Sequence, residues 1–187
     1  VGHHRRHNPL VAEAKAALEA GRIGKVIAVQ GTCWFLKPPG YFEVPWRRQA
    51  GAGPILLNLI HDVDLLRHLV GEVASVHALA SNAERGHPVE DTAAILLRFA
   101  GGALGTLSVS DTVVAPWSWE LTSGENPAYS HTAESCCLIG GTTGSLTVPW
   151  LDLWHNPTRP SWWEPIERAR LPVTQADPLR LQVRNLC

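Results

Sequence analysis

Residues 53–71 read GPILLNLIHDVDLLRHLVG, a leucine-rich segment interrupted by polar residues at helical spacing. Its apolar positions recur three and four residues apart, which predicts a helix with one buried stripe made of Leu56, Leu59, Ile60, Val63, Leu66 and Val70. Asn58, His61 and Asp64 follow one another at intervals of three, so they share one flank of that helix. Because burying an unpaired polar group is costly, this flank indicates either a solvated surface or a functional site.

His61 is the residue on this flank with the most specific chemistry. An imidazole has an ordinary pKa of about 6.5, so it exchanges protons around neutral pH. A carboxylate, Asp62 or Asp64, could orient the ring and stabilise its charged form. The competing interpretation is a structural histidine bonded to a backbone carbonyl.

Two metal sites can be drawn from the histidines. His61, Asp64 and His68 fall at i, i+3 and i+7 of the predicted helix and could hold zinc, although this span is long for a single ion. The segment GHHRRH at 2–7 offers three more imidazoles, but two of them are adjacent and adjacent side chains rarely converge. We therefore expect no metal site.

Length and composition limit the class of protein. The chain has 187 residues, 45% of them hydrophobic, which suits one domain, or one domain with a fragment of another. The 16 basic and 17 acidic residues give a formal net charge of −1, which provides no long-range attraction to nucleic acid or anionic lipid. No apolar run approaches the roughly 20 residues that span a bilayer, and no secretory signal opens the chain.

The cysteines fit no zinc or redox spacing, which predicts reduced thiols in a cytoplasmic protein. They are Cys33, Cys136, Cys137 and Cys187. The chain contains no methionine and begins inside an apparently structured motif, so we expect it to be a piece of a longer product.

The remaining chain predicts two helices near the start and seven or eight strands, mostly in hairpins. The expected elements are helices over 10–20 and 53–71, strands over 25–36, 73–82, 92–100, 103–111, 136–139 and 145–148, a short strand over 119–122, two further extended stretches over 151–155 and 163–171, and the opening of a last helix over 175–187. Residues 37–53 form a loop. This pattern predicts an α+β domain with an open, mostly antiparallel or mixed β-sheet and helices packed on one face.

Eight tryptophans stand beside two tyrosines, and most of them lie in predicted loops or at strand ends. Such side chains stack on sugar rings or build protein interfaces. Trp34 and Trp46 flank the loop before the His61 helix, which favours a pocket, whereas an interface suits the later six at least as well. The sequence contains no G-x-G-x-x-G, Walker, G-x-S-x-G or Cys-x-x-Cys motif, so it does not by itself encode phosphate or dinucleotide binding.

Three segments together resemble the Gfo/Idh/MocA oxidoreductases, named for glucose–fructose oxidoreductase, inositol dehydrogenase and a rhizopine-catabolism protein. The first is HRR at 4–6, followed by a helix and then GRIGKV at 21–26. The second and most specific is GAGP at 51–54 with HDVDLL at 61–66 and Gly71-Glu72. The third is GGTTGSLTVP at 140–149, and the likeness covers nearly the whole chain.

The resemblance implies a Rossmann domain that binds NAD or NADP, followed by a C-terminal α+β domain with an open sheet. It implies hydride transfer to or from a sugar, inositol or related polyol, with His61 in proton transfer beside Asn58 and Asp64. A lysine in a Glu-Lys-Pro motif of the Rossmann domain helps in that scheme. Many members place an aspartate four residues before the histidine; here that position is Leu57, and Asn58 cannot accept a proton as a base.

By the same likeness, Arg5 and four residues of the 37–53 loop would line the substrate pocket. Those four are Lys37, Tyr41, Trp46 and Arg47, and a set of polar groups with aromatic platforms suits a polyhydroxylated ligand.

We therefore expect residues 1–8 to end the Rossmann part and residues 9–187 to form the substrate-binding and oligomerisation domain, truncated at its C-terminal end. The chain alone is expected to lack dehydrogenase activity, and the whole protein to form a homo-oligomer through the open sheet face that carries Thr32. No nucleic-acid or membrane partner is expected. Two alternatives stay open: a non-catalytic binding or assembly protein on this scaffold, and a metal-dependent hydrolase or isomerase using His61, Asp64 and His68.

Overall fold

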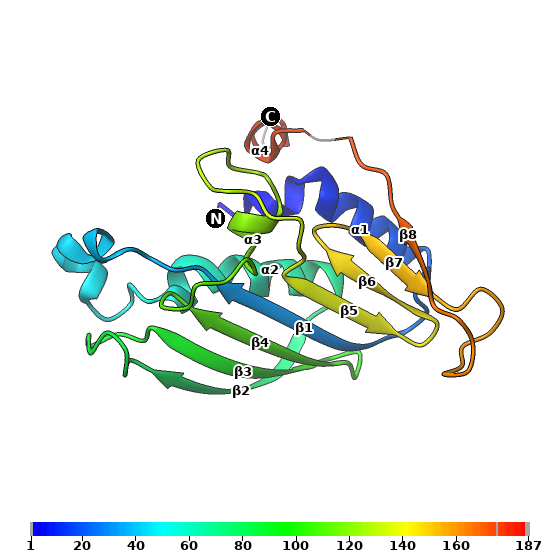
Figure 1. Cartoon of the computed structure of the whole chain (residues 1–187), viewed down its shortest axis with the longest axis horizontal. Coiled ribbons are helices and arrows are strands. Elements are labelled where there is room, and N and C mark those ends of the chain that lie inside the picture. The colour runs from blue at the N-terminus through cyan, green and yellow to red at the C-terminus, as the bar shows by residue number, and fades with distance from the viewer. Residues whose placement is uncertain (1, 175, 186–187) are drawn as a thin grey trace.

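One mixed sheet of eight strands organises the computed structural model, which describes residues 2–174 and 176–185 (Figure 1). The strand order is β2-β3-β4-β1-β5-β6-β7-β8. In chain order the strands are β1 (Val26–Trp34), β2 (Val73–Ser81), β3 (Thr92–Phe99), β4 (Leu104–Ser110), β5 (Cys137–Gly141), β6 (Gly144–Val148), β7 (Asp152–His155) and β8 (Glu167–Arg170). Strands β1 and β4 are parallel, and the other neighbours are antiparallel, which confirms the predicted fold class.

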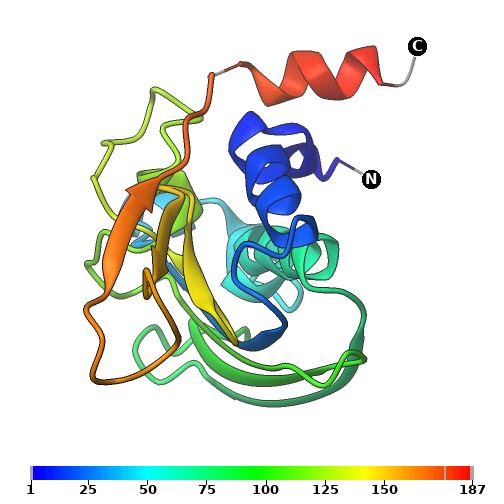
Figure 2. The same ribbon diagram turned by 90° about the vertical axis from the view of Figure 1, so that its right-hand side faces the viewer.

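The helices cover one face of this sheet. Figure 2 shows the sheet curving around α1 (Pro9–Glu19) and α2 (Ile60–Leu69), while its other face carries no helix. Helix α1 begins where the Asn8 side chain accepts a hydrogen bond from the Leu10 amide. Shorter helical segments are η1 (His4–His7), η2 (Pro39–Glu43), η3 (Pro45–Arg48), α3 (Trp119–Thr122) and α4 (Pro178–Arg184).

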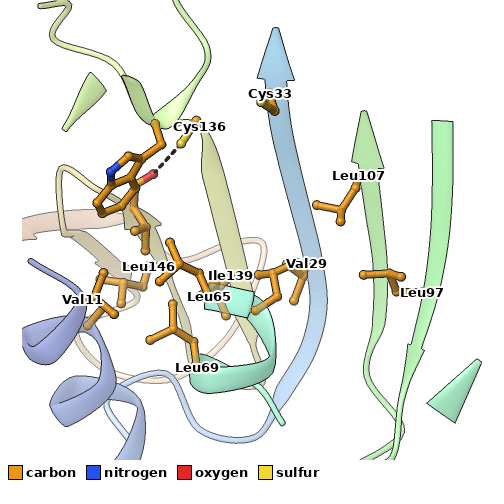
Figure 3. Close-up of a cluster of buried hydrophobic side chains, with 14 of the residues drawn as sticks. Val11, Val29, Cys33, Leu65, Leu69, Leu97, Leu107, Cys136, Ile139 and Leu146 are labelled. Carbon is orange, nitrogen blue, oxygen red and sulfur yellow. Dashed lines mark hydrogen bonds between the residues drawn. The ribbon is translucent and has the colours of Figure 1, made fainter. Parts of the chain in front are cut away.

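The core lies between the helices and the covered face of the sheet (Figure 3). Strand β3 shows the cause: Ala93, Ile95, Leu97 and Phe99 alternate with exposed residues, so one face of the strand is buried. On the side of the helices, Val11 of α1 lies beside Leu146 of β6, and Leu65 and Leu69 of α2 lie near Ile139 of β5 (Figure 3). Each fully buried aliphatic side chain of this kind contributes roughly 1.5–3 kcal/mol.

The helix predicted over 53–71 is present but starts irregularly. Residues Ile55–Leu59 (η4) form a π-helical turn, in which the Ile60 amide bonds the Ile55 carbonyl, and α2 follows. The predicted stripe is therefore partly wrong: Leu59 and Leu66 are buried, but Leu56 is 56% and Ile60 36% exposed. A π-turn inserts an extra residue, so the phase of the stripe shifts between its two ends.

Three further differences concern short elements. Trp119–Thr122, predicted as a strand, is a helical turn, because the Ser118 carbonyl accepts both the Thr122 amide and the Thr122 hydroxyl while Trp119 is buried. The extended stretch 163–171 contains only the short strand β8. The last helix is α4; positions 175, 186 and 187, including the predicted Cys187 thiol, lie outside the described residues.

Within residues 2–174 and 176–185, no helix has both the length and the apolar character needed to cross a bilayer.

Candidate functional site

His61 lies in the first turn of α2. It is close to the imidazole of His4 in η1 and to that of His3, the residue before η1. The ring centroids of His3 and His4 lie 5.5 and 5.8 Å from that of His61. The His61 ring is half-buried, and its Nδ1 is buried without a hydrogen-bond partner in the described part of the chain. Burial lowers the pKa of His61, and Arg5, His4 and His3 lower it further, while Glu120 opposes them. The imidazole is therefore neutral at pH 7 and able to accept a proton.

His4 is held in place by a carboxylate. Its Nε2 lies 2.5 Å from Oε1 of Glu125, and Oε2 of Glu125 accepts hydrogen bonds from the side chains of Asn8 (2.9 Å) and Trp119 (3.1 Å). Glu125 therefore positions one of the two imidazoles that face His61. Sequence reasoning missed this carboxylate, because 121 positions separate His4 from Glu125 and no local pattern links them.

Arg5, predicted to bind substrate, lies in a buried ion-pair network. The residue is 3% exposed; its Nη1 donates to Asp62 Oδ1 (3.1 Å) and its Nη2 to Glu120 Oε1 (2.8 Å). Its guanidinium also lies 5.3 Å from the centre of the Trp119 ring. Burial raises the pKa of Asp62 to about 6, against the opposing effect of Arg5. The network ties η1 to α2 and α3.

Asp64 and Asn58 flank His61 differently. Arg6 binds Asp64 with two hydrogen bonds of 2.7 and 2.6 Å. Burial acts to raise the pKa of Asp64, but these bonds outweigh it and the net shift is downward. The Asp64 carboxylate is thus engaged by Arg6 rather than by His61. Asn58 lies in the π-turn, and its Oδ1 is buried without a partner among the described residues.

The four loop residues predicted to bind substrate lie together. The Lys37 ammonium is 5.1 Å, and the Arg47 guanidinium 4.1 Å, from the centre of the Tyr41 ring. Arg47 also lies 5.6 Å from the centre of the half-exposed Trp46 ring. Burial lowers the pKa of Lys37, partly offset by Asp111, whose Oδ2 is 3.6 Å from Nζ.

Lys37 lines a cavity of about 530 Å³ together with Phe42, Arg48 and Arg85. His61 is not among the residues that line it, so the structure does not bring His61 and the Lys37 loop into one enclosed cavity. Two larger hollows, of about 1120 and 940 Å³, lie on the uncovered face of the sheet; Trp154 lines both of them and Thr32 lines the first.

The described residues show no group of three or more His, Cys, Asp or Glu side chains arranged to hold a metal ion. The metal set His61, Asp64 and His68 therefore does not assemble in this part of the chain.

Comparison with known proteins places these features in context. A family model for the GFO/IDH/MocA C-terminal domain matches residues 11–147. Levoglucosan dehydrogenase of Pseudarthrobacter phenanthrenivorans is 33% identical over 118 residues, which cover 58% of this chain and 30% of that protein. Myo-inositol 2-dehydrogenase of Thermotoga maritima is 36% identical over 122 residues, 61% of this chain and 34% of that protein. The matches thus span about a third of these relatives.

Solved structures share the fold. The WlbA dehydrogenase of Chromobacterium violaceum, crystallised with NADH and UDP-GlcNAcA, has a TM-score of 0.64 and 26% identity over 79% of this chain and 39% of that one. An oxidoreductase of Thermotoga maritima covers 100% of this chain and 50% of that one with a TM-score of 0.70 at 18% identity, which shows the fold alone.

Proposed function

Because the chain belongs to the Gfo/Idh/MocA family, we propose that it is the substrate-binding domain of an NAD(P)-dependent dehydrogenase acting on a sugar, inositol or related polyol. The named relatives are levoglucosan and inositol dehydrogenases, which supports this substrate class. The chain spans about a third of their length, so the activity of the whole protein is part of the proposal. Residues 1–8 would end the Rossmann part and residues 9–187 form this domain.

His61 is the proton-transfer residue of the proposal. The observation that carries it is a half-buried imidazole whose Nδ1 has no hydrogen-bond partner among the described residues and whose neighbours are His3, His4 and the Arg5 network. Burial lowers its pKa below the ordinary value of about 6.5, which favours the neutral form at pH 7. A neutral imidazole accepts the proton of a substrate hydroxyl as the carbonyl forms, and returns it in the reverse direction. Neighbouring cationic groups limit how readily the ring becomes charged, which keeps it a modest base near neutral pH.

Asn58 and Asp64 would support this step in different ways. The amide oxygen of Asn58, which has no partner among residues 2–174 and 176–185, can accept a hydrogen bond from a substrate hydroxyl but cannot take its proton. Asp64 holds Arg6 and lies 3.9 Å from Nδ1 of His3, so it acts through the residues around His61. By the family resemblance, other parts of the polyol would be bound by Lys37, Tyr41, Trp46 and Arg47, although the cavity that Lys37 lines does not include His61.

The described residues do not fit the phosphates of a dinucleotide, because this sequence has no glycine-rich phosphate-binding motif. NAD or NADP would be held mainly by the Rossmann domain, and the chain alone would be inactive. Titrating this chain with NADH while following fluorescence tests that statement: tight, saturable binding would contradict it.

We further propose a homo-oligomer formed through the uncovered face of the sheet. Leu79, Leu96, Leu104 and Leu138 are exposed there, with Leu79 at 81%, and an apolar face of this kind is usually buried by a partner. The described cysteines Cys33, Cys136 and Cys137 are free thiols, which supports a cytoplasmic protein.

The function is tested by comparing two histidines of the same helix in the whole protein. In a screen of NAD(+)- and NADP(+)-linked oxidation of levoglucosan and myo-inositol, His61→Asn should lower kcat by about 10²- to 10⁴-fold. His68→Asn, a partly exposed position seven residues further along α2, should leave kcat unchanged. A His61→Asn enzyme with native kcat would contradict the proposed role.

A binding or assembly protein without catalysis is the second candidate, favoured by Leu57 at the position where many family members have aspartate. Complete absence of NAD(P)-linked turnover in the whole protein, with sugar binding retained, would support it.

A further inference from the structure

The ammonium of Lys37 is buried and has unused hydrogen-bonding capacity. An ammonium group has three donors, yet Nζ of Lys37 has no hydrogen-bond partner among the described residues. Its nearest carboxylate oxygen, Oδ2 of Asp111, is 3.6 Å away, which is an ion pair but longer than a hydrogen bond. Because a buried donor without an acceptor is costly even when its charge is paired, this arrangement favours a ligand that supplies acceptors.

The Asp111 carboxylate does not neutralise Lys37 alone, because it also forms an ion pair with Arg85. Arg85 Nε donates to Asp111 Oδ1 at 2.8 Å, and its Nη2 donates to the backbone carbonyls of Asp111 (2.5 Å) and Lys37 (3.0 Å). One buried carboxylate is therefore shared between two cations.

A second unused donor lies on the same aromatic ring. Arg47 stacks on Tyr41 and donates from Nη1 to the Tyr41 carbonyl, but its Nε is buried without a partner in the described chain. The face of an aromatic ring attracts a cation but does not replace a hydrogen-bond acceptor. Lys37 and Arg47 thus lie near the Tyr41 ring, and no described residue accepts a hydrogen bond from Nζ of Lys37 or from Nε of Arg47.

The cavity beside Lys37 is largely open to solvent, and its volume of about 530 Å³ falls within the range of roughly 300–1,000 Å³ typical of ligand pockets. Its walls carry three cationic side chains, Lys37, Arg48 and Arg85, and two carboxylates, Glu43 and Glu84. Among the described residues of this wall, the buried polar atom without a partner is the donor Nζ of Lys37, and neither glutamate contributes such an atom. Nζ of Lys37 therefore lacks a hydrogen-bond acceptor, which a ligand in the cavity could supply.

We propose that this cavity binds the carboxylate of an acidic sugar or polyol, such as a uronate or aldonate, with Lys37, a residue of its wall, as the first donor and Arg47, which lies outside the wall on the Tyr41 ring, as the second. This inference rests on the proposed function in placing the substrate at the 37–48 loop, and it narrows the substrate class. Carboxylate binding would also stabilise the charged form of Lys37, whose pKa burial lowers. Affinity for the acid should therefore fall as the pH rises and Lys37 loses its proton.

Calorimetric titration of this chain with D-glucuronate, D-gluconate and D-glucose at low salt tests the proposal. The two acids should bind at least about tenfold more tightly than D-glucose, because a charge-assisted hydrogen bond is worth about 1.5–3 kcal/mol. Lys37→Met should abolish this preference, so that the two acids bind no more tightly than D-glucose. Arg67→Gln, which removes a surface ion pair with Glu72, is the matched control and should leave all three affinities unchanged.

Urea unfolding verifies that Lys37→Met is folded, and Arg47→Gln provides a second variant in the exposed loop that should lose part of the preference. Equal affinities for D-glucuronate and D-glucose, no binding of either acid, or an unchanged preference in folded Lys37→Met would each overturn the proposal. These outcomes leave the role of His61 intact, because the kcat comparison of His61→Asn with His68→Asn tests that role separately.

Discussion

Replacing Arg5 by methionine should destabilise the protein strongly and in a pH-dependent way. Methionine keeps most of the side-chain volume but leaves the carboxylates of Asp62 and Glu120 without their shared cation. Both carboxyl side chains are mostly buried, at 15% and 14% exposure. Because removing one partner strands a buried charge, we expect the free energy of unfolding at pH 7 to fall by about 3–5 kcal/mol.

The pH dependence follows from Asp62. Its raised pKa of about 6 means that at pH 5 the carboxyl is mostly protonated in the folded protein, even with Arg5 present. At pH 5 the Asp62 carboxyl therefore carries little charge, and only Glu120 is left as an unpaired carboxylate in Arg5→Met. The decrease in the free energy of unfolding caused by Arg5→Met should then be roughly half of that at pH 7. Adding Asp62→Asn to Arg5→Met should restore part of the stability at pH 7.

Urea denaturation followed by circular dichroism at pH 7 and pH 5 measures these differences. Arg67→Met is the control: it breaks an ion pair whose side chains are 46% and 69% exposed, so it should cost less than about 1 kcal/mol at both pH values. An Arg5→Met loss below about 1 kcal/mol, or a loss equal at the two pH values, would refute the reasoning.

Three other outcomes follow from single residues. The lowered pKa of His61 means that, below about pH 6.5, the unfolded chain binds a proton that the folded chain resists. The contribution of His61 to stability should thus fall on acidification, opposite in sign to that of Asp62, whose raised pKa favours the folded state at low pH. Urea unfolding at pH 7 and 5.5 should therefore show a more favourable change on acidification in His61→Asn than in the native protein. Gly141→Ala should cost about 2–4 kcal/mol, because the new Cβ meets the Ile23 carbonyl oxygen, whereas Gly101→Ala, with open space around it, should be nearly neutral in thermal melts. Burial raises the pKa of Cys136 to about 12, so mass spectrometry should find this thiol unmodified by a thiol reagent until urea unfolds the chain.

Alternation of apolar residues predicted the strands well because most strands have one buried face. Residues 92–99 show this directly, with every second residue buried against the helices. The pairing of β1 with β4 and β5 could not be derived in the same way, because alternation defines the faces of a strand but not its neighbours in the sheet.

The phase of the His61 helix was harder to predict. A constant period of 3.6 residues placed Leu56 and Ile60 in the core, and the π-turn at 55–59 breaks that period. Leu65 and Leu69 take the buried positions instead. No sequence feature of 53–59 distinguished this turn from an ordinary one.

In the candidate site, contacts between residues close in sequence could be predicted, whereas contacts between distant segments could not. Lys37, Tyr41 and Arg47 are close in sequence, so their grouping could be anticipated from one loop. The pairing of Arg5 with Asp62, and of Lys37 with Asp111, joins segments far apart in the chain. Sequence alone therefore identified Arg5, Asp62 and Lys37, but it missed Asp111 and did not show which charges neutralise one another.

The position of β1 has a consequence for how the chain folds. Strands β2 to β4 and strands β5 to β8 can each assemble from hairpins of consecutive segments, whereas β1 must pair with distant strands on both edges, Ala28 with Leu104 and with Gly140. Closing such long loops lowers the conformational entropy of the chain before any strand contact has formed to offset that loss. We expect the two hairpin groups to form early and the insertion of β1 between them to set the folding rate, so that both edges facing the gap stay vulnerable to aggregation until that strand arrives.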